Sequence, residues 1–237
     1  MPTAAALIIG NEILSGKFAD ENGPFLIERM RALGCDLKRI VVLADVHDDI
    51  SAEVARCSEA YDFVITTGGV GPTHDDITLE SVAAAFGLPL ELEPSLLKLL
   101  VDYGLPDNTA TRRMVQLPQG SELVWEEGLS YPVLVVRNVY VFPGVPKLMH
   151  AKFEHVAHRF AGEAVLTARI YTPQRETEIA AILGQVQDAH PNVDIGSYPR
   201  WGEGNYSVIV TLESRDADAL ASAVGVLRAQ LVCVDPG

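Results

Sequence analysis

The residues best suited to chemistry fall in one short stretch. It holds three glycines, Gly68, Gly69 and Gly71, followed by the adjacent carboxylates Asp75 and Asp76. Glycines between a strand and a helix expose backbone N–H groups that can bind phosphate. Paired carboxylates near an anion site suit a hard divalent cation, which prefers oxygen ligands. The stretch therefore predicts a phosphate-bearing ligand together with a divalent metal.

The acidic pair also has a structural interpretation, which the sequence leaves open. A helix is expected at 76–86, and Asp is favoured at the position that caps a helix N-terminus. One aspartate could cap this helix while the other binds metal. His74 precedes the pair and could act as a general acid, a general base or a phosphate donor.

The glycines match neither of the two common phosphate loops. A dinucleotide fingerprint requires a third glycine three residues after Gly71, where the chain has His74. The string most like a P-loop runs from Gly10 to Lys17. It has five residues between its glycines instead of four, and Phe18 replaces the required Ser or Thr. We therefore exclude both motifs.

The elements around the glycines alternate between strand and helix. Apolar runs predict strands at 4–9, 40–43 and 63–67, and amphipathic spacing predicts helices at 22–33 and 48–57. Such alternation predicts an α/β fold with a parallel sheet that helices cover on both faces.

In open parallel sheets, ligands bind beyond the carboxyl ends of the strands. Three segments rich in Gly or Pro follow such ends, at 10–12, 68–71 and 143–146, and we expect them to form one pocket. The candidate substrate-binding residues are Gly10, Asn11, Glu12, Thr67, Gly68, Gly69, Val70, Gly71, Pro72, Thr73, Thr78, Pro143, Gly144 and Pro146.

A second polar cluster follows the first strand. It comprises Glu12, Asp20, Glu21 and Asn22, which could extend a cation site or contact a ribose, and Glu12 comes directly after the strand end. A solvated loop is the plainer interpretation of Asp20 and Glu21. Asn22 is expected to cap the helix whose first turn contains Pro24.

The rest of the chain predicts further elements and a second domain. Arg112 and Arg113 could reach a phosphate or lie on a solvated helix face. Residues 161–163 mark a boundary, so we predict an α/β domain at 1–165 and a small α+β module at 166–237. The other elements expected before the boundary are helices at 94–103 and from 107–109, strands at 122–125, 133–137 and 139–142, and a helix ending near 160.

Composition narrows the class of protein. The chain has 237 residues and a formal net charge of −14, which argues against a nucleic-acid or anionic-membrane surface. No apolar run is long enough to span a membrane, and no signal peptide is evident. Three widely spaced cysteines suggest reduced thiols. We expect a cytoplasmic protein with a small-molecule ligand.

Three strings carry a family resemblance: GNEILSG (10–16), TGGVGPTHDDIT (67–78) and FPGVP (142–146). They resemble the molybdopterin-binding (MoaB/Mog-like) domain, in the subtype found at the amino terminus of CinA and of eukaryotic FAD synthases. The module that follows also resembles the small α+β region after this domain in CinA-like proteins.

The resemblance implies a three-layer α/β fold that binds an adenine nucleotide or a pterin phosphate such as molybdopterin. CinA-like members imply hydrolysis of ADP-ribose with a divalent metal such as Mg²⁺, and the FAD synthase domain implies hydrolysis of FAD. On this chain, Asp75 and Asp76 would be metal ligands, and His74 would join them as a catalytic residue. A homo-oligomer, dimer or trimer, is also expected.

Two other functions stay open at this point. Mog-like members imply adenylylation of molybdopterin with ATP, and a non-catalytic nucleotide or pterin sensor would use the same pocket. The motif has the form found in CinA and FAD synthase, which favours hydrolysis. The amidase domain of full CinA and the FAD synthetase domain do not appear in this chain, so we expect neither of their activities.

Overall fold

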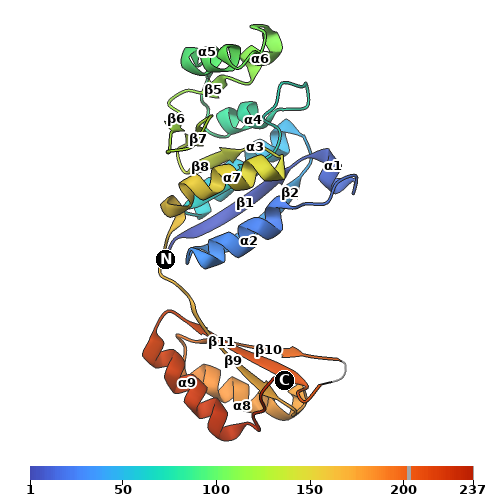
Figure 1. The fold of residues 1–237 in the computed structure, drawn as a ribbon, viewed down its shortest axis with the longest axis vertical. Coiled ribbons are helices and arrows are strands. Elements are labelled where there is room, and N and C mark those ends of the chain that lie inside the picture. Colours follow the sequence, from blue (N-terminus) through green and yellow to red (C-terminus); the bar gives the residue numbers. More distant parts are fainter. Residues whose placement is uncertain (202–203, 237) are drawn as a thin grey trace. The chain divides into compact units, whose positions relative to one another are not determined.

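The computed structural model describes residues 1–201 and 204–236. The chain divides into two compact units, Met1–Gly162 and Glu163–Gly237. The boundary expected between 165 and 166 lies a few residues after this division. Figure 1 shows that each unit is a sheet with helices packed against it.

The first unit is built on a six-stranded sheet whose strands are mostly parallel. Its first four strands in spatial order run parallel, and β7 is antiparallel to both of its neighbours. The predicted α/β fold with a mostly parallel sheet is thus confirmed. In spatial order the strands are β2 (Asp36–Leu43), β1 (Thr3–Ile9), β3 (Phe63–Thr67), β8 (Val139–Phe142), β7 (Val133–Val136) and β6 (Glu122–Val124).

Helices cover both faces of this sheet, which gives the predicted three layers (Figure 1). Two hydrophobic cores result, one on each face. One core receives side chains from α2 (Asn22–Ala32) and α7 (Pro146–Val156). The other receives side chains from α3 (His47–Ala60), α4 (Thr78–Ala85) and α5 (Pro94–Asp102).

Strand β1 shows how the sequence builds two cores from one sheet. Ala4 and Ala6 belong to the core beneath α2 and α7, whereas Ala5 and Leu7 belong to the core beneath α3 and α4. Successive side chains on a strand point to opposite faces. An uninterrupted apolar run is therefore what a doubly covered parallel strand requires.

Several elements differ from the sequence-based expectation. Strand β2 begins at Asp36, before the expected start at residue 40, because its first residues pair with Thr3 and Ala4. The segment after β1 is not a plain loop but contains a short helix, α1 (Asn11–Leu14). A two-stranded sheet of β4 (Leu90–Leu92) and β5 (Gln116–Pro118) was not predicted.

Two predicted N-terminal caps, those of α4 and α2, are wrong. Helix α4 begins at Thr78, and neither preceding aspartate caps it. Asn22 does not cap α2, because the Asp20 carboxylate accepts the backbone N–H groups of Asn22 and Gly23 instead. The expected helix after 107–109 is present as α6 (Thr109–Arg113). The helix expected to end near 160 is α7 followed by a 3₁₀ turn, Ala157–Phe160.

The second unit is an α+β module with its own core. Its strands form an antiparallel sheet in the order β10, β11, β9. Side chains of both helices and all three strands make up its hydrophobic cluster. The elements in chain order are β9 (Leu166–Thr172), α8 (Glu176–Ala189), β10 (Asp194–Pro199), β11 (Val208–Ser214) and α9 (Ala217–Gln230).

No helix in the described part of the chain is both long and apolar enough to cross a bilayer. No disulfide joins the three cysteines in the described chain; Cys35 and Cys57 are buried, and Cys233 is exposed. Burial raises the pKa of Cys57 to about 11, so this thiol stays protonated and unreactive at neutral pH.

Candidate active site

The ends of β1, β3 and β8 meet at backbone contact. A Cβ atom built on Gly68 would lie 2.1 Å from the carbonyl oxygen of Ile9, and one on Gly144 would lie 3.1 Å from the Cα of Gly68. Side chains at these two positions would push the strand ends apart. The three expected segments therefore do lie together, and glycine makes their approach possible.

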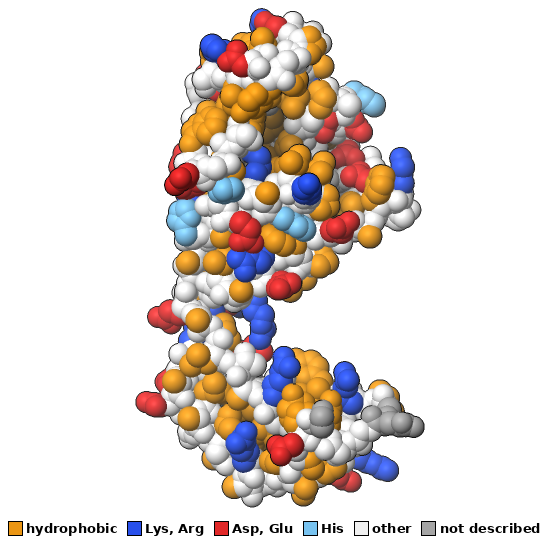
Figure 2. All heavy atoms as spheres, in the orientation of Figure 1, with side chains coloured by type: hydrophobic (Ala, Val, Ile, Leu, Met, Phe, Trp, Pro, Cys, Tyr) orange, Lys and Arg blue, Asp and Glu red, His pale blue; other side chains and the backbone are white. Residues whose placement is uncertain are grey.

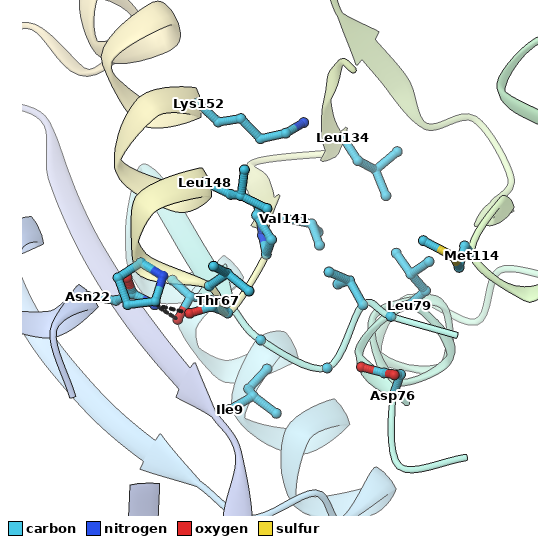
Figure 3. A pocket seen from close by; sticks show the side chains of 18 of the residues that line it. Ile9, Asn22, Thr67, Asp76, Leu79, Met114, Leu134, Val141, Leu148 and Lys152 are labelled. Carbon is cyan, nitrogen blue, oxygen red and sulfur yellow. Dashed lines mark hydrogen bonds between the residues drawn. The ribbon is translucent and has the colours of Figure 1, made fainter. Parts of the chain in front are cut away.

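A cavity of about 840 Å³ opens at this junction. Its lining includes Glu12, Thr67, Gly68, Gly69, Val70, Gly71, Asp76, Pro143, Gly144 and Pro146 from the predicted set. Gly10, Asn11, Pro72, Thr73, His74, Asp75 and Thr78 do not line it. Figure 2 shows hydrophobic side chains around a hollow in this unit, and Figure 3 shows the cavity wall from close by.

The glycine turn is held in shape by Thr78, which is fully buried. The backbone N–H of Thr78 donates to the Gly69 carbonyl at 2.9 Å, and its hydroxyl donates to the Gly68 carbonyl at 2.8 Å. Gly68 and Gly69 have φ angles of 99° and 63°, which favour glycine. Thr78 thus supports the turn from behind and does not face the ligand.

Not all amides of the turn are available for an anion. The N–H of Gly68 donates to the Phe142 carbonyl at 3.2 Å and so belongs to the sheet. Within the described residues, the N–H groups of Gly69, Val70 and Gly71 have no protein acceptor. These three amides at the cavity wall are the donors that could bind phosphate.

Asp76 reaches the cavity, whereas its two predicted partners do not. The Asp76 carboxylate accepts the N–H of Thr73 at 2.8 Å and the Thr73 hydroxyl at 2.5 Å. The side chains of Asp75 and His74 are 59% and 97% exposed, and the Nδ1 atom of His74 lies 3.9 Å from a carboxylate oxygen of Asp75. The polar side chain of Thr73 and the backbone of Asp75 lower the pKa of the Asp75 carboxyl.

Arg113 fixes this acidic loop from outside the cavity. Its guanidinium donates to the Thr73 carbonyl at 3.0 Å and pairs with Glu80 at 3.0 Å. Its neighbour Arg112 pairs with Asp107. Both arginines therefore have protein partners. Neither lines the cavity, where a contact with phosphate was one of the two interpretations of these residues.

The donor set fits a cation that arrives with its ligand. No group of three or more His, Cys, Asp or Glu among the described residues forms a ready-made metal cage. Mg²⁺ commonly uses one or two carboxylates together with substrate phosphates and water. Asp76 suits this role. A Cβ atom on Gly71 would lie 2.6 Å from the Asp76 carboxylate, so the absence of a side chain at Gly71 leaves space for this carboxylate beside the turn.

Asn22 is a site residue that sequence reasoning considered only as a member of the second polar cluster and as a helix cap. It is only 4% exposed, and its side-chain nitrogen donates to the Gly144 carbonyl at 2.9 Å and to the Thr67 hydroxyl at 3.4 Å (Figure 3). Its side-chain oxygen is buried at the cavity wall and has no partner in the described chain. A buried acceptor without a partner is costly, so a ligand donor would complete it.

The far half of the cavity was also not anticipated. It is apolar, and its side chains come from α5, the residue after α6, the two strands β7 and β8, and α7. Figure 3 labels those of Met114, Leu134, Val141 and Leu148. We call this half the apolar chamber; it is lined by Leu96, Leu100, Met114, Leu134, Val141 and Leu148. Lys152 lies beside it, and burial lowers the pKa of this lysine to about 8.

Comparison with known proteins decides the family. Residues 5–162 match the sequence family described as the probable molybdopterin binding domain. The chain belongs to this family. Residues 164–234 of this molybdopterin-binding-domain protein match a second family, the FAD synthase middle domain.

Individual relatives support the assignment. A protein of Archaeoglobus fulgidus is 35% identical over 216 residues, which are 91% of this chain and 92% of that protein. A probable FAD synthase of Caenorhabditis briggsae is 32% identical over 97% of this chain. The molybdopterin-binding-domain chain spans about half of that relative's length, 50%.

A solved structure has the same fold. The CinA protein of Thermoplasma acidophilum superposes with a TM-score of 0.61 at 28% identity. The match covers 68% of this chain and 99% of the other. The predicted resemblance to CinA-like molybdopterin-binding domains is therefore confirmed.

Proposed function

We propose that the chain binds a nucleotide or pterin phosphate in this cavity and hydrolyses a nucleoside diphosphate linkage, of the ADP-ribose or FAD type, with a divalent metal. The observation that carries the proposal is the meeting of the three amides of Gly69, Val70 and Gly71 with the Asp76 carboxylate at one cavity wall. Anion donors beside a carboxylate suit a diphosphate with its cation.

Each residue has a definite part in this proposal. The three amides bind the diphosphate oxygens and stabilise the charge that develops on them during hydrolysis. Asp76 would hold the metal, which when bound polarises the phosphoryl oxygens and lowers the pKa of a coordinated water. The Asn22 side-chain oxygen accepts a hydrogen bond from a ligand hydroxyl or N–H group and so orients it.

The test is a screen of ADP-ribose, FAD, NAD and ATP with Mg²⁺ or Mn²⁺, followed by product analysis. We expect Asp76→Asn to lower turnover at least about 100-fold, because loss of metal charge stabilisation is worth several kcal/mol. Asp49→Asn, an exposed carboxylate on α3, is the matched control. Full metal-dependent turnover in Asp76→Asn would contradict the proposal.

Asp75 and His74 enter the same assay. Their side chains lie outside the cavity lining, so a direct role would require the 73–76 loop to move toward the ligand. Asp75→Asn and His74→Gln are compared with Asp76→Asn at equal metal concentration. A loss as large as that of Asp76→Asn would assign them to catalysis, and near-normal turnover would limit the metal to Asp76.

A second function is favoured by one observation, the family match to the probable molybdopterin binding domain. It is the transfer of an adenylyl group from ATP to molybdopterin. Incubation with molybdopterin, ATP and Mg²⁺, assayed for the adenylylated product, tests it. Ligand binding without turnover of any candidate would indicate a non-catalytic module.

A further inference from the structure

The cavity has two chemically different halves. One part carries the glycine turn with the Asp76 carboxylate beside it, and the other carboxylates in the lining are Glu12, Asp20 and Glu21. The other half is the apolar chamber. A ligand whose diphosphate lies at the glycine turn must therefore place a different kind of group in the chamber.

Lys152 is the one cationic side chain in the lining of this cavity, as far as the described residues show. Its Nζ atom donates to the carbonyl oxygens of Tyr131 and Pro132, both at 2.7 Å. An ammonium group has three donors, so one remains, and the Nζ atom also lies 4.8 Å from the centroid of the Tyr131 ring. Figure 3 shows the lysine extending toward Leu134, on the side of the cavity opposite Asp76.

We propose that Lys152 determines ligand specificity, by donating its remaining N–H to a carbonyl oxygen or ring nitrogen of a planar heteroaromatic group in the apolar chamber. The inference rests on the proposed function, because it takes the diphosphate to lie at the glycine turn. It narrows the substrate class to diphosphates that carry such a ring on the side away from the adenosine.

The chamber itself argues against a bare sugar in this position. Ribose hydroxyls placed against Leu100, Leu134 and Val141 would lose water and gain no hydrogen bond, which costs free energy for each buried hydroxyl. A flat ring instead buries apolar area against these side chains. Its polar edge can then meet Lys152, the nearby donor.

Lys152 also has a structural contact, and the test must separate the two roles. The segment 130–132 lines the cavity and is held from one side by Lys152. On the other side the Tyr103 hydroxyl donates to the Ser130 carbonyl at 2.8 Å. If Lys152 served only to hold this segment, removal of the Tyr103 hydroxyl would have a similar effect on ligand binding.

The experiment measures binding of FAD and of ADP-ribose to the full chain by calorimetry, in EDTA and again with Mg²⁺. The two probes share the ADP half and differ in the group beyond it. We expect Lys152→Met to weaken FAD binding about tenfold or more, the usual effect of losing a hydrogen bond to a charged donor. Binding of ADP-ribose should change less than about twofold.

Two control variants complete the test. Lys147→Met removes an exposed lysine from the same helix and should leave the binding of both probes unchanged. Tyr103→Phe removes the other contact of the 130–132 segment. Equal losses for FAD and ADP-ribose in Lys152→Met, or a Tyr103→Phe variant that matches it, would overturn the inference.

The result for the unaltered chain separates this inference from the proposed function. If the chain binds both probes with equal affinity, the inference fails while the proposed function stands. If it binds neither probe in either buffer, the proposed function fails and the inference fails with it. Tighter binding of FAD that depends on Lys152 supports both.

Discussion

The side-chain nitrogen of Asn22 donates a hydrogen bond to the carbonyl oxygen of Gly144 at 2.9 Å. This bond ties the start of α2 to the turn after β8, two segments that lie far apart in the sequence. It also fixes the direction of the side-chain oxygen, which is buried without a protein partner. Asn22 therefore supports the cavity wall, and we propose that its oxygen accepts a hydrogen bond from the ligand.

Replacing Asn22 by Ala should affect both stability and binding. The Gly144 carbonyl would lose its donor, so we expect the free energy of unfolding to fall by about 1–3 kcal/mol. Ligand binding should weaken about fivefold to tenfold, because the acceptor is lost as well. Thermal unfolding and calorimetry measure the two effects. Asn192→Ala, at an exposed position, is the control, and an equal loss of binding there would refute the role of Asn22.

Replacing Gly71 should weaken metal binding more than it destabilises the fold. A Cβ atom there would lie 2.6 Å from the Asp76 carboxylate and displace it. We expect Gly71→Ala to raise the metal concentration needed for half-maximal turnover about tenfold, as displaced ligand geometry commonly does. Gly225→Ala in α9 has open space around the new atom and should stabilise the helix by about 0.5–1 kcal/mol. An unchanged metal requirement in Gly71→Ala would argue against Asp76 as the ligand.

Thr78 should matter through its hydroxyl. Thr78→Val keeps the shape of the side chain but leaves the buried Gly68 carbonyl without its donor. Loss of that hydrogen bond should lower the free energy of unfolding by about 1–3 kcal/mol and weaken phosphate binding at the turn. Thr78→Ser retains the donor, so its free energy of unfolding should lie between those of Thr78→Val and the unaltered chain. Urea unfolding checks the prediction, and identical midpoints for Val and Ser would contradict it.

Binding of a ring-bearing ligand should depend on pH through Lys152. Burial lowers the pKa of this lysine to about 8, so the ammonium is present below that pH and lost above it. FAD affinity should therefore fall about threefold to tenfold as the pH rises through 8, and Lys152→Met should remove this step. The other ionisable groups in the described cavity lining, or in contact with Lys152, are Tyr103, Tyr131, Glu12, Asp20, Glu21 and Asp76.

Burial raises the pKa of Tyr131 to about 12, so its phenol should not produce a step near pH 8. Calorimetric titrations between pH 6.5 and 9.5 measure the profile. A step of equal size in Lys152→Met would assign the dependence to another group.

Local sequence patterns were sufficient to predict the parallel sheet. Apolar runs such as Ala4–Ile9 can only be strands covered on both faces, and the glycine-rich turns mark where those strands end. The junction of three strand ends follows from topology alone. The strands and turns depend on residues that are close together in the sequence, which is why they could be predicted, and the parallel topology then brings their ends together.

The remaining features depend on partners distant in sequence. The strand Leu90–Leu92 pairs with Gln116–Pro118, and neither three-residue segment carries a strand pattern of its own. Asn22 was expected to be a cap because it precedes Pro24, but Asp20 stood close enough to compete for that role. The apolar chamber draws its residues from five elements, so no single stretch of sequence could reveal it.

The two halves of the cavity come from different blocks of the chain. The glycine turn and its supports belong to the strand ends, whereas most of the chamber and the 130–132 segment come from residues between 87 and 136. Substitutions at chamber positions in this block would therefore change which group the chamber accepts without changing any residue of the glycine turn.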